Sequence, residues 1–510
     1  MILGPALDNV LPRKQLIGLI ESSALRDKTV ILSLLSQLLE HNGVLSTQSF
    51  AKYIQLLDAL LDQDEESLAQ AFHLKMFWQP AYLSATKVKV DGVFFVWIGS
   101  LGYRQLEYYE IWQRVCRGNT KIYYDSRYLL AGEIKPTLGR LFGCYFDSQQ
   151  WVERQNHCLQ RFLESHELNF DDFFIRYVRR YNPNLAFGLE VQLASIKKRY
   201  QYLNQHTHLV DIAKIDGLFD MSARSFERYY QYELILRHNL AAASDIVRLL
   251  ILYHQGGMYV DFDTLPCFEH CFKRTNQHYP DLVNRNMSDL VKSEIILDLF
   301  RRKKALKWGR GRQSSALLDE VMRTFFSDQP QFLKSLSTDV DGLTPEQILI
   351  DFPLPGVHQH GLCLSAAKNA GGEFNNNVLV AHKHSKTVRI VLRTMMKRYA
   401  FLEQHDIVFG TRLSERHTND EYWLRFNDYR RDHLKTDNNV TLFLSGPSMI
   451  LETTLSLCYE VLDIGMCSPS AIALALSHPQ LGFSYHYQTQ FTVEHMRSSW
   501  LRNQNLFSEQ

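Results

Sequence analysis

Two aspartates, Asp261 and Asp263, end a short apolar segment near the middle of the 510-residue chain. Carboxylate oxygens suit Mg2+ or Mn2+, and such an ion can in turn bind the oxygens of a diphosphate. The preceding apolar stretch carries Asp245 and Arg248, and charged groups are costly to bury unless they are paired or bind a ligand. These four side chains therefore predict one polar site for a metal ion and a nucleotide diphosphate.

A helix is expected to carry the first pair of these charged residues. Residues 240–253 are rich in Ala, Leu and Ile, and the pair Gly256-Gly257 follows them as a glycine cap would. Asp245 and Arg248 stand three residues apart, so they share one face of this helix and can address one ligand together.

A buried strand is expected to carry the two aspartates that follow. Residues 258–262 are apolar and bounded by glycine and proline, which favours a strand inside a sheet. Because side chains alternate along a strand, Tyr259, Asp261 and Asp263 are expected to point to the same side.

Two other Asp-x-Asp pairs occur in the chain, and such a pair alone is a weak signal. Asp62 and Asp64 lie at an acidic helix junction, whereas Asp339 and Asp341 precede a glycine and indicate a solvated turn. Neither pair follows a buried helix, a glycine pair and a strand. This context favours the pair that ends at Asp263.

Residues 227–266 resemble the catalytic core of the large clostridial glucosylating toxins, whose enzymes are retaining glycosyltransferases of the GT-A fold. Further blocks follow the family's order and extend the resemblance over most of the chain. They are Phe95 to Gly99 with Tyr123 to Ser126, Phe374 to Val380 with Ser385, Leu444 to Pro447, and Ser498 to Trp500. The resemblance implies an α/β fold with a Rossmann-like mixed sheet of the GT-A type.

The resemblance implies that the bound nucleotide is the UDP part of a UDP-sugar. Trp97 would stack on the uracil ring, a task for a large flat π-surface, and Val96 would contact the nucleotide beside it. Tyr259 and Asp261 would also contact the nucleotide, and Ser498 and Trp500 would close over the diphosphate from a C-terminal loop.

The implied reaction moves the sugar with retention of configuration at its anomeric carbon. The residues implied in catalysis are Asp245, Arg248, Asp261, Asp263, Asn376 and Trp500. Asp245 and Arg248 would hold the sugar hydroxyls, and Asn376 would donate to the sugar or to the glycosidic oxygen. Its neighbours Asn375 and Asn377 differ from the family's usual pairs, so glucose and N-acetylglucosamine both stay open as donor sugars.

The implied metal ion is Mn2+ or Mg2+, shared by the aspartates and the C-terminal loop. The implied ligands are Asp261, Asp263, Glu494, His495 and Ser498. The family has a glutamate three residues before the loop serine, and His495 stands there in this chain beside Glu494. Which of these two residues contacts the metal stays open, since imidazole also suits Mn2+.

The chain is expected to form two domains. Residues 12–76 alternate helical stretches with turn signals, which predicts an N-terminal helical bundle over 1–85. The clostridial enzymes begin with a similar bundle, which in them favours membrane surfaces. The catalytic domain is expected over 86–510, with a helical insertion at about 275–350.

The composition is typical of a large soluble enzyme. The chain is 45% hydrophobic and 22% charged, and its net charge of +1 argues against bulk nucleic-acid binding. No apolar run approaches the length of a membrane span, and the N-terminus lacks the pattern of a secretory signal. The eight scattered cysteines indicate reduced thiols.

The resemblance implies a bacterial toxin or effector, secreted without a classical signal peptide and delivered to the host cytoplasm. It would transfer glucose or N-acetylglucosamine to a side chain of a host protein, a small GTPase or another. Two alternatives stay open: a transferase with a glycan or lipid acceptor, and a non-catalytic relative that only binds sugar nucleotides.

Overall fold

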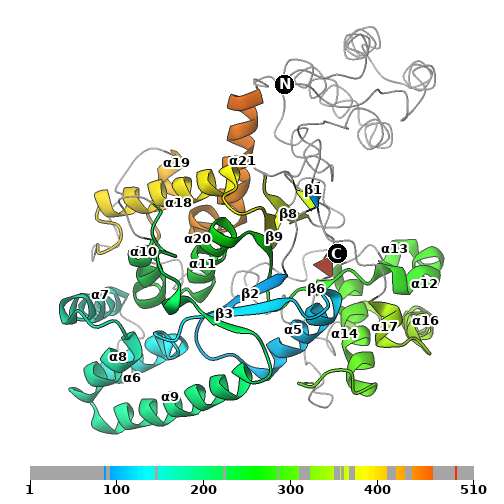
Figure 1. The fold of residues 1–510 in the computed structure, drawn as a ribbon, viewed down its shortest axis with the longest axis horizontal. Coiled ribbons are helices and arrows are strands. Elements are labelled where there is room, and N and C mark those ends of the chain that lie inside the picture. Colours follow the sequence, from blue (N-terminus) through cyan, green and yellow to red (C-terminus); the bar gives the residue numbers. More distant parts are fainter. Residues whose placement is uncertain are drawn as a thin grey trace.

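A mixed sheet of six strands forms the centre of the protein in a computed structural model (Figure 1). The structure describes residues 86–87, 92–143, 148–221, 226–283, 286–308, 322–349, 356–357, 361–366, 374–410, 421–430, 439–462 and 489–490. The strand order is β4-β3-β2-β5-β9-β8. The strands are β2 (Val93–Trp97), β3 (Thr120–Tyr124), β4 (Leu209–Asp211), β5 (Gly257–Val260), β8 (Cys363–Ala366) and β9 (Phe374–Ala381).

The strand directions bring distant parts of the chain to one edge of the sheet. Strands β2 to β5 run parallel, whereas β9 runs antiparallel to both β5 and β8. The carboxyl ends of β2 and β5 therefore meet the amino end of β9. Val260 pairs with Val378, and the Asp261 amide donates to the Asn377 carbonyl at 2.8 Å.

Two short ribbons accompany the main sheet. β1 (Thr86–Lys87) pairs with β7 (Gly356–Val357), and β6 (Leu265–Pro266) pairs with β10 (Thr489–Gln490), both antiparallel. Because β6 begins two residues after Asp263, the second ribbon places a C-terminal segment beside the Asp-x-Asp pair.

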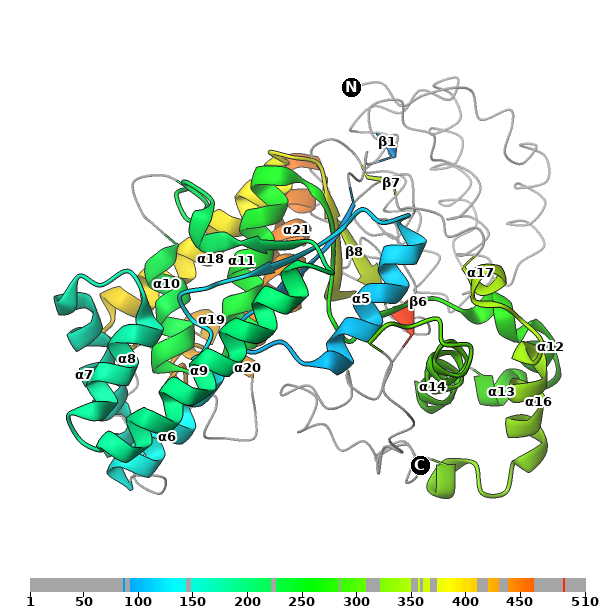
Figure 2. The ribbon, with the colours of Figure 1, turned by 60° about the horizontal axis from the view of Figure 1, so that its bottom comes forward.

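Helices cover both faces of the sheet (Figures 1 and 2). α5 (Tyr103–Val115) packs against β2 and β3, and α11 (Leu240–Gln255) packs against β2, β5 and β9 on the other face. A further layer lies near α11. It contains α10 (Glu227–Gln231), the π-helical turn η4 (Tyr232–Leu236), α18 (Lys386–Gln404), α19 (Glu421–Leu424), α20 (Asn439–Leu444) and α21 (Pro447–Leu462).

Two helical lobes extend from this centre in opposite directions (Figure 2). One contains α6 (Ile134–Phe142), α7 (Ser148–Ser165), α8 (Phe170–Arg179) and α9 (Pro183–Asn204). The other has its own apolar core and contains α12 (Lys273–His278), α13 (Pro280–Val283), α14 (Asn286–Arg302), α16 (Pro330–Val340) and α17 (Pro345–Ile348). The 3-10 turns are η2 (Ala131–Glu133), η3 (Ile212–Lys214) and η5 (Glu269–Phe272).

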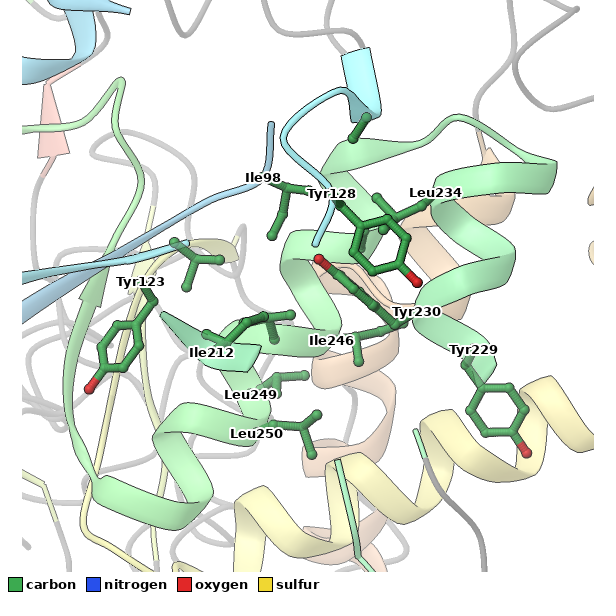
Figure 3. Close-up of a cluster of buried hydrophobic side chains, with 14 of the residues drawn as sticks. Ile98, Tyr123, Tyr128, Ile212, Tyr229, Tyr230, Leu234, Ile246, Leu249 and Leu250 are labelled. Carbon is green, nitrogen blue, oxygen red and sulfur yellow. The ribbon is translucent and has the colours of Figure 1, made fainter. Parts of the chain in front are cut away.

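Helix α11 is buried along most of its length, which fixes the charged residues that it carries. Ile246, Leu249 and Leu250 are almost fully buried and lie in the cluster of Figure 3, with aromatic side chains from other elements. The helix ends at Gly256, whose φ is 70°. A Cβ there would lie 2.5 Å from the Lys383 amide nitrogen, so the turn into β5 requires glycine.

The predicted α/β class with a mixed sheet is confirmed, while two local expectations were wrong. The strand predicted over 258–262 ends at Val260, because Asp261 and Asp263 lie in a turn closed by a bond from the Thr264 amide to the Asp261 carbonyl at 3.1 Å. The solvated turn predicted for Asp339 and Asp341 is present only at Asp341, which is exposed. Asp339 lies in α16, and its carboxylate accepts from the Thr275 amide at 2.9 Å. The N-terminal bundle predicted over 1–85 lies outside the described residues.

A buried carboxylate ties α8 to the loop that follows β3. Asp171 is fully buried and accepts from the amides of Leu129 at 2.8 Å and Leu130 at 2.9 Å. Burial raises the pKa of Asp171 to about 7, although the two amide bonds lower it. The negative charge of Asp125 contributes a smaller increase.

This carboxylate predicts a pH-dependent stability. Because the pKa of Asp171 is higher in the folded protein than in the unfolded chain, its contribution to stability is fully present at low pH and is lost as the pH rises through about 7. Asp171→Asn should flatten the fall in Tm between about pH 4 and pH 7, measured by calorimetry. The free energy of unfolding of the variant should also be lower by about 1–3 kcal/mol, because one of the two backbone amides loses its acceptor. Asp172→Asn, at an exposed neighbour, should keep the wild-type slope; an unchanged slope in Asp171→Asn would contradict the assignment.

Candidate active site

A cavity of about 500 Å3 opens where β2, β5 and β9 meet, and its size is typical of a small-molecule site. Six segments line it: the end of β2, the start of α5, α11, the end of β5 with its turn, the start of β9, and the junction of α20 with α21. The lining residues are Val96, Trp97, Ile98, Arg104, Gln105, Leu240, Ala241, Ser244, Asp245, Arg248, Tyr259, Asp261, Phe262, Asp263, Asn376, Thr441, Leu442, Gly446 and Pro447.

The Arg248 guanidinium joins three of these segments. Its Nη2 forms an ion pair with Asp245 on the same helix. Its Nη1 lies 3.1 Å from Asp261 Oδ1 and donates to the Asn376 carbonyl at 2.9 Å. The guanidinium carbon also lies 4.8 Å from the centre of the Tyr259 ring. Only 6% of the side chain is exposed, so the charge is stabilised mainly by these partners rather than by water.

The Asp245 carboxylate is held from two further sides. Its Oδ1 accepts from Asn376 Nδ2 at 3.1 Å, and its Oδ2 accepts from the Ser445 hydroxyl at 2.8 Å. These contacts come from β9 and from the junction of α20 with α21. Asp245 is therefore fixed by three segments of the chain.

Tyr259 orients the first aspartate of the Asp-x-Asp pair. Its hydroxyl donates to Asp261 Oδ1, the same oxygen that faces Arg248. Burial raises the pKa of Tyr259 well above its ordinary value; Arg248 opposes this increase and Asp261 adds to it. The hydroxyl consequently keeps its proton and remains a donor.

The second aspartate, Asp263, also lines the cavity, and the turn around it is fixed by its neighbour. The Thr264 hydroxyl lies 3.4 Å from Asp263 Oδ1. The Thr264 carbonyl accepts from Trp112 Nε1 at 2.9 Å, and its hydroxyl oxygen accepts from Asn377 Nδ2 at 3.2 Å. The carboxylate of Asp263 thus projects into the cavity from a backbone anchored to α5 and β9.

The three asparagines at the start of β9 point in different directions. Asn376 lines the cavity, whereas the Asn377 amide group bonds to Ser365 and Thr264. Neither Asn375 nor Asn377 lines the cavity in the described part of the chain. The two residues that the family resemblance connects with the choice of donor sugar are therefore not among the lining residues, although Asn377 bonds to the backbone of Asp261.

The donor chemistry of the cavity fits a divalent cation that also binds a ligand. Mg2+ is often held by one or two carboxylates together with phosphate oxygens, and Asp261 and Asp263 supply such carboxylates. No cluster of three or more His, Cys, Asp or Glu side chains suited to a metal occurs among the described residues. Glu494, His495, Ser498 and Trp500 lie outside the residues that the structure describes.

Several residues of the cavity were not predicted. Arg104 and Gln105 enter from the first turn of α5, and Thr441 and Leu442 come from α20. Ser445, the residue after α20, does not line the cavity but donates to Asp245, which does. The sequence offered a partial signal, because Leu444 to Pro447 belong to a block of family resemblance. Nothing in that block indicated that Ser445 contacts a residue 200 positions earlier.

Comparison with known proteins identifies a family. The model of the TcdA/TcdB catalytic glycosyltransferase domain matches residues 159–454. The chain is 23% identical over 468 residues to Cytotoxin-L of Paraclostridium sordellii, covering 80% of this chain and 18% of that protein. It is 22% identical over 462 residues to Toxin A of Clostridium novyi, covering 81% and 20%. The chain thus spans about a fifth of the length of these relatives.

Solved structures share the fold. The catalytic domain of alpha-toxin from Clostridium novyi aligns with a TM-score of 0.62 at 18% identity, covering 98% of each chain. The UDP-bound glycosyltransferase domain of the YGT toxin aligns with a TM-score of 0.53 at 17% identity, covering 80% of this chain and 82% of that one. The resemblance found in the sequence is confirmed. Because the family match extends over more than half of the chain, this chain belongs to the TcdA/TcdB catalytic glycosyltransferase domain family.

Proposed function

We propose that the protein transfers a sugar from a UDP-sugar, with a divalent cation and with retention at the anomeric carbon. One observation carries the proposal: in a chain of a glycosyltransferase family, one cavity gathers Asp245 and Arg248 from α11, Asp263 from the turn after β5, and Asn376 from β9. The YGT toxin domain, which has the same fold, was solved with UDP bound, and this supports UDP as the nucleotide.

Trp97 is the proposed platform for the uracil ring. It ends β2, and its ring stands nearly perpendicular to Phe262, with centroids 5.4 Å apart at 89°. This contact with the ring of Phe262 holds the indole in place. Its Nε1 is buried and has no hydrogen-bond partner among the described residues. Val96 lines the cavity next to it.

The charge of the cavity supports the need for a cation. The charged lining residues are two arginines, Arg104 and Arg248, and three aspartates, Asp245, Asp261 and Asp263, so the described lining has a net charge of −1. A diphosphate would be repelled there, and Arg248 already faces two carboxylates. A divalent cation held by Asp263 and Asp261 would offset this negative charge. The cation would act as a Lewis acid and stabilise the negative charge of the leaving diphosphate.

The residues of the chain would act mainly by orientation. Asp245 and Asn376, which are hydrogen-bonded at 3.1 Å, would hold the sugar. Arg248 would fix the positions of the Asp245 and Asp261 carboxylates through its ion pairs with both. The bond from the anomeric carbon to the diphosphate would break, and the oxygen of the acceptor hydroxyl would bond to that carbon on the same face. The proton of that hydroxyl would pass to the departing diphosphate. Orientation of this kind lowers the entropic cost of bringing donor and acceptor together.

Glucose and N-acetylglucosamine are the proposed donor sugars, and a side chain of a host protein, a small GTPase or another, is the proposed acceptor. The names of the relatives support a toxin or effector role in host cells. Labelled UDP-glucose and UDP-N-acetylglucosamine incubated with host lysate should label protein when Mn2+ is present. Label only in glycan or lipid would instead favour the alternative acceptor, and wild-type protein that binds UDP without turnover would favour the non-catalytic alternative.

Membrane contact is proposed for residues 1–85, and closure over the diphosphate is proposed for the loop with Glu494, His495, Ser498 and Trp500. No helix in the described part of the chain is long and apolar enough to span a membrane. Delivery to the host cytoplasm remains a proposal that follows from the relatives.

The first prediction from this proposal concerns the metal. Asp263→Asn should abolish Mn2+-dependent hydrolysis of the UDP-sugar while Tm stays near the wild-type value, because one ligand charge is lost without a change of shape. Asp341→Asn provides a matched control, since Asp341 is exposed and belongs to another Asp-x-Asp pair; it should retain full activity. Full turnover by Asp263→Asn with Mn2+ would show that this aspartate is not a metal ligand.

The second prediction concerns the nucleotide. Trp97→Ala should weaken UDP binding by roughly 1–3 kcal/mol, the scale of one base stacked on an aromatic ring, as measured by calorimetry. Trp97→Phe should retain part of that affinity, because a smaller flat ring remains. Wild-type protein that binds a GDP-sugar tightly and UDP not at all would exclude the proposed nucleotide.

A further inference from the structure

Ser445 occupies a rigid turn between α20 and α21. Its side chain is fully buried, and its amide donates to the Thr441 carbonyl at 3.1 Å. The next amide, that of Gly446, donates to the same carbonyl at 2.9 Å. A Cβ at Gly446 would lie 3.0 Å from Leu442 Cα, so the turn has little room for any other residue. The backbone therefore fixes where the Ser445 side chain begins, and the bond to Asp245 Oδ2 at 2.8 Å orients its hydroxyl.

The same turn is tied to the helix that carries Asp245. The Thr441 hydroxyl oxygen accepts from Arg237 Nη2 at 2.8 Å and from Asn239 Nδ2 at 2.7 Å. Asn239 caps α11, since its side-chain oxygen accepts from the Ala242 amide at 3.0 Å. The start of α11 and the end of α20 are thus one hydrogen-bonded unit.

The hydrogen bonds of Asp245 show what Ser445 contributes. A carboxylate offers about four acceptor positions. Among the described residues, Asp245 Oδ1 faces Arg248 and Asn376, and Oδ2 accepts from Ser445 at 2.8 Å. One position then remains on Oδ2, in a carboxylate that lines the cavity. Without the Ser445 hydroxyl, Oδ2 would have no donor from the described protein.

We propose that Ser445 is a positioning residue for sugar transfer, which orients the Asp245 carboxylate so that its one remaining acceptor position receives a hydroxyl of the donor sugar. The inference rests on the proposed function of this cavity. Ser445 acts through Asp245 and does not line the cavity itself. Its effect concerns the sugar part of the donor, because Asp245 is a residue proposed to hold the sugar.

The test compares ligands with and without the sugar. In Ser445→Ala, kcat/KM for hydrolysis of UDP-glucose or UDP-N-acetylglucosamine should fall roughly 10- to 100-fold, as expected for one hydrogen bond to a charged group. The affinity for UDP should change by less than about twofold, because UDP carries no donor-sugar hydroxyl that could bond to Asp245. A structural defect of the cavity would instead weaken the binding of UDP and of the UDP-sugar to the same extent.

A double-mutant cycle tests whether Ser445 acts through Asp245. In an Asp245→Ala background, adding Ser445→Ala should change the affinity for the UDP-sugar by less than about twofold, because the oriented group is gone. The cycle is measured by calorimetry, so it does not depend on turnover. Ser385→Ala is the matched control: Ser385 is a buried serine that donates to the Gly361 carbonyl at 2.8 Å, and its loss should lower Tm without changing kcat/KM.

The outcomes separate this inference from the proposed function. Wild-type protein that neither binds UDP nor hydrolyses any UDP-sugar would overturn the proposed function, and this inference with it. Wild-type protein with normal turnover, but with equal losses for UDP and UDP-sugar in Ser445→Ala, would overturn the inference alone. The inference would also be overturned if Ser445→Ala lowered the affinity for the UDP-sugar equally in the wild-type and the Asp245→Ala backgrounds.

Discussion

The organisation of the active site depends on one buried guanidinium. Arg248 contacts a carboxylate on its own helix, a carboxylate after β5 and a backbone carbonyl of β9. A planar group with donors in fixed directions can do this, whereas a lysine ammonium has no fixed fork. Burying such a charge is expensive, and well-packed apolar groups often stabilise a core equally well. Under the proposed function, the arginine would hold acidic groups close together in a cavity that also binds a diphosphate.

A second buried ion pair, between Glu233 and Arg237, stabilises the helices around Arg248. Glu233, in the π-helical turn before α11, forms an ion pair with Arg237 and accepts from the hydroxyls of Tyr399 at 2.7 Å and Tyr429 at 3.0 Å. Burial raises the pKa of Glu233, and these three partners oppose the increase. Arg237 also donates to Thr441, which accepts from Asn239, the N-cap of α11. The network therefore joins η4, α18, α20 and the start of α11. The positions of α11 and of its neighbours are therefore linked through polar contacts as well as through the apolar core.

The sequence predicted the local parts of the site better than its long-range contacts. Helical spacing was enough to place Asp245 and Arg248 on one face, and a glycine pair was enough to mark the end of α11. The end of β5 was misplaced, because apolar periodicity continues through Phe262 although the backbone turns. The contact of Ser445 with Asp245 joins residues 200 positions apart, and no local pattern encodes such a distance. The directions of the asparagines of β9 depend on strand register, which a run of identical residues does not specify.

The long sequence separation between β2, β5 and β9, whose ends form the cavity, has a consequence for when the cavity forms during folding. The cavity is closed by segments that lie between residues 96 and 447, and neither half of the chain contains them all. Contacts of such long sequence separation form late, because the entropy of closing large loops must be overcome first. Enzymatic competence should therefore appear only after the strands from both halves have docked. A partly folded chain with most of its helices already in place would still lack a binding cavity.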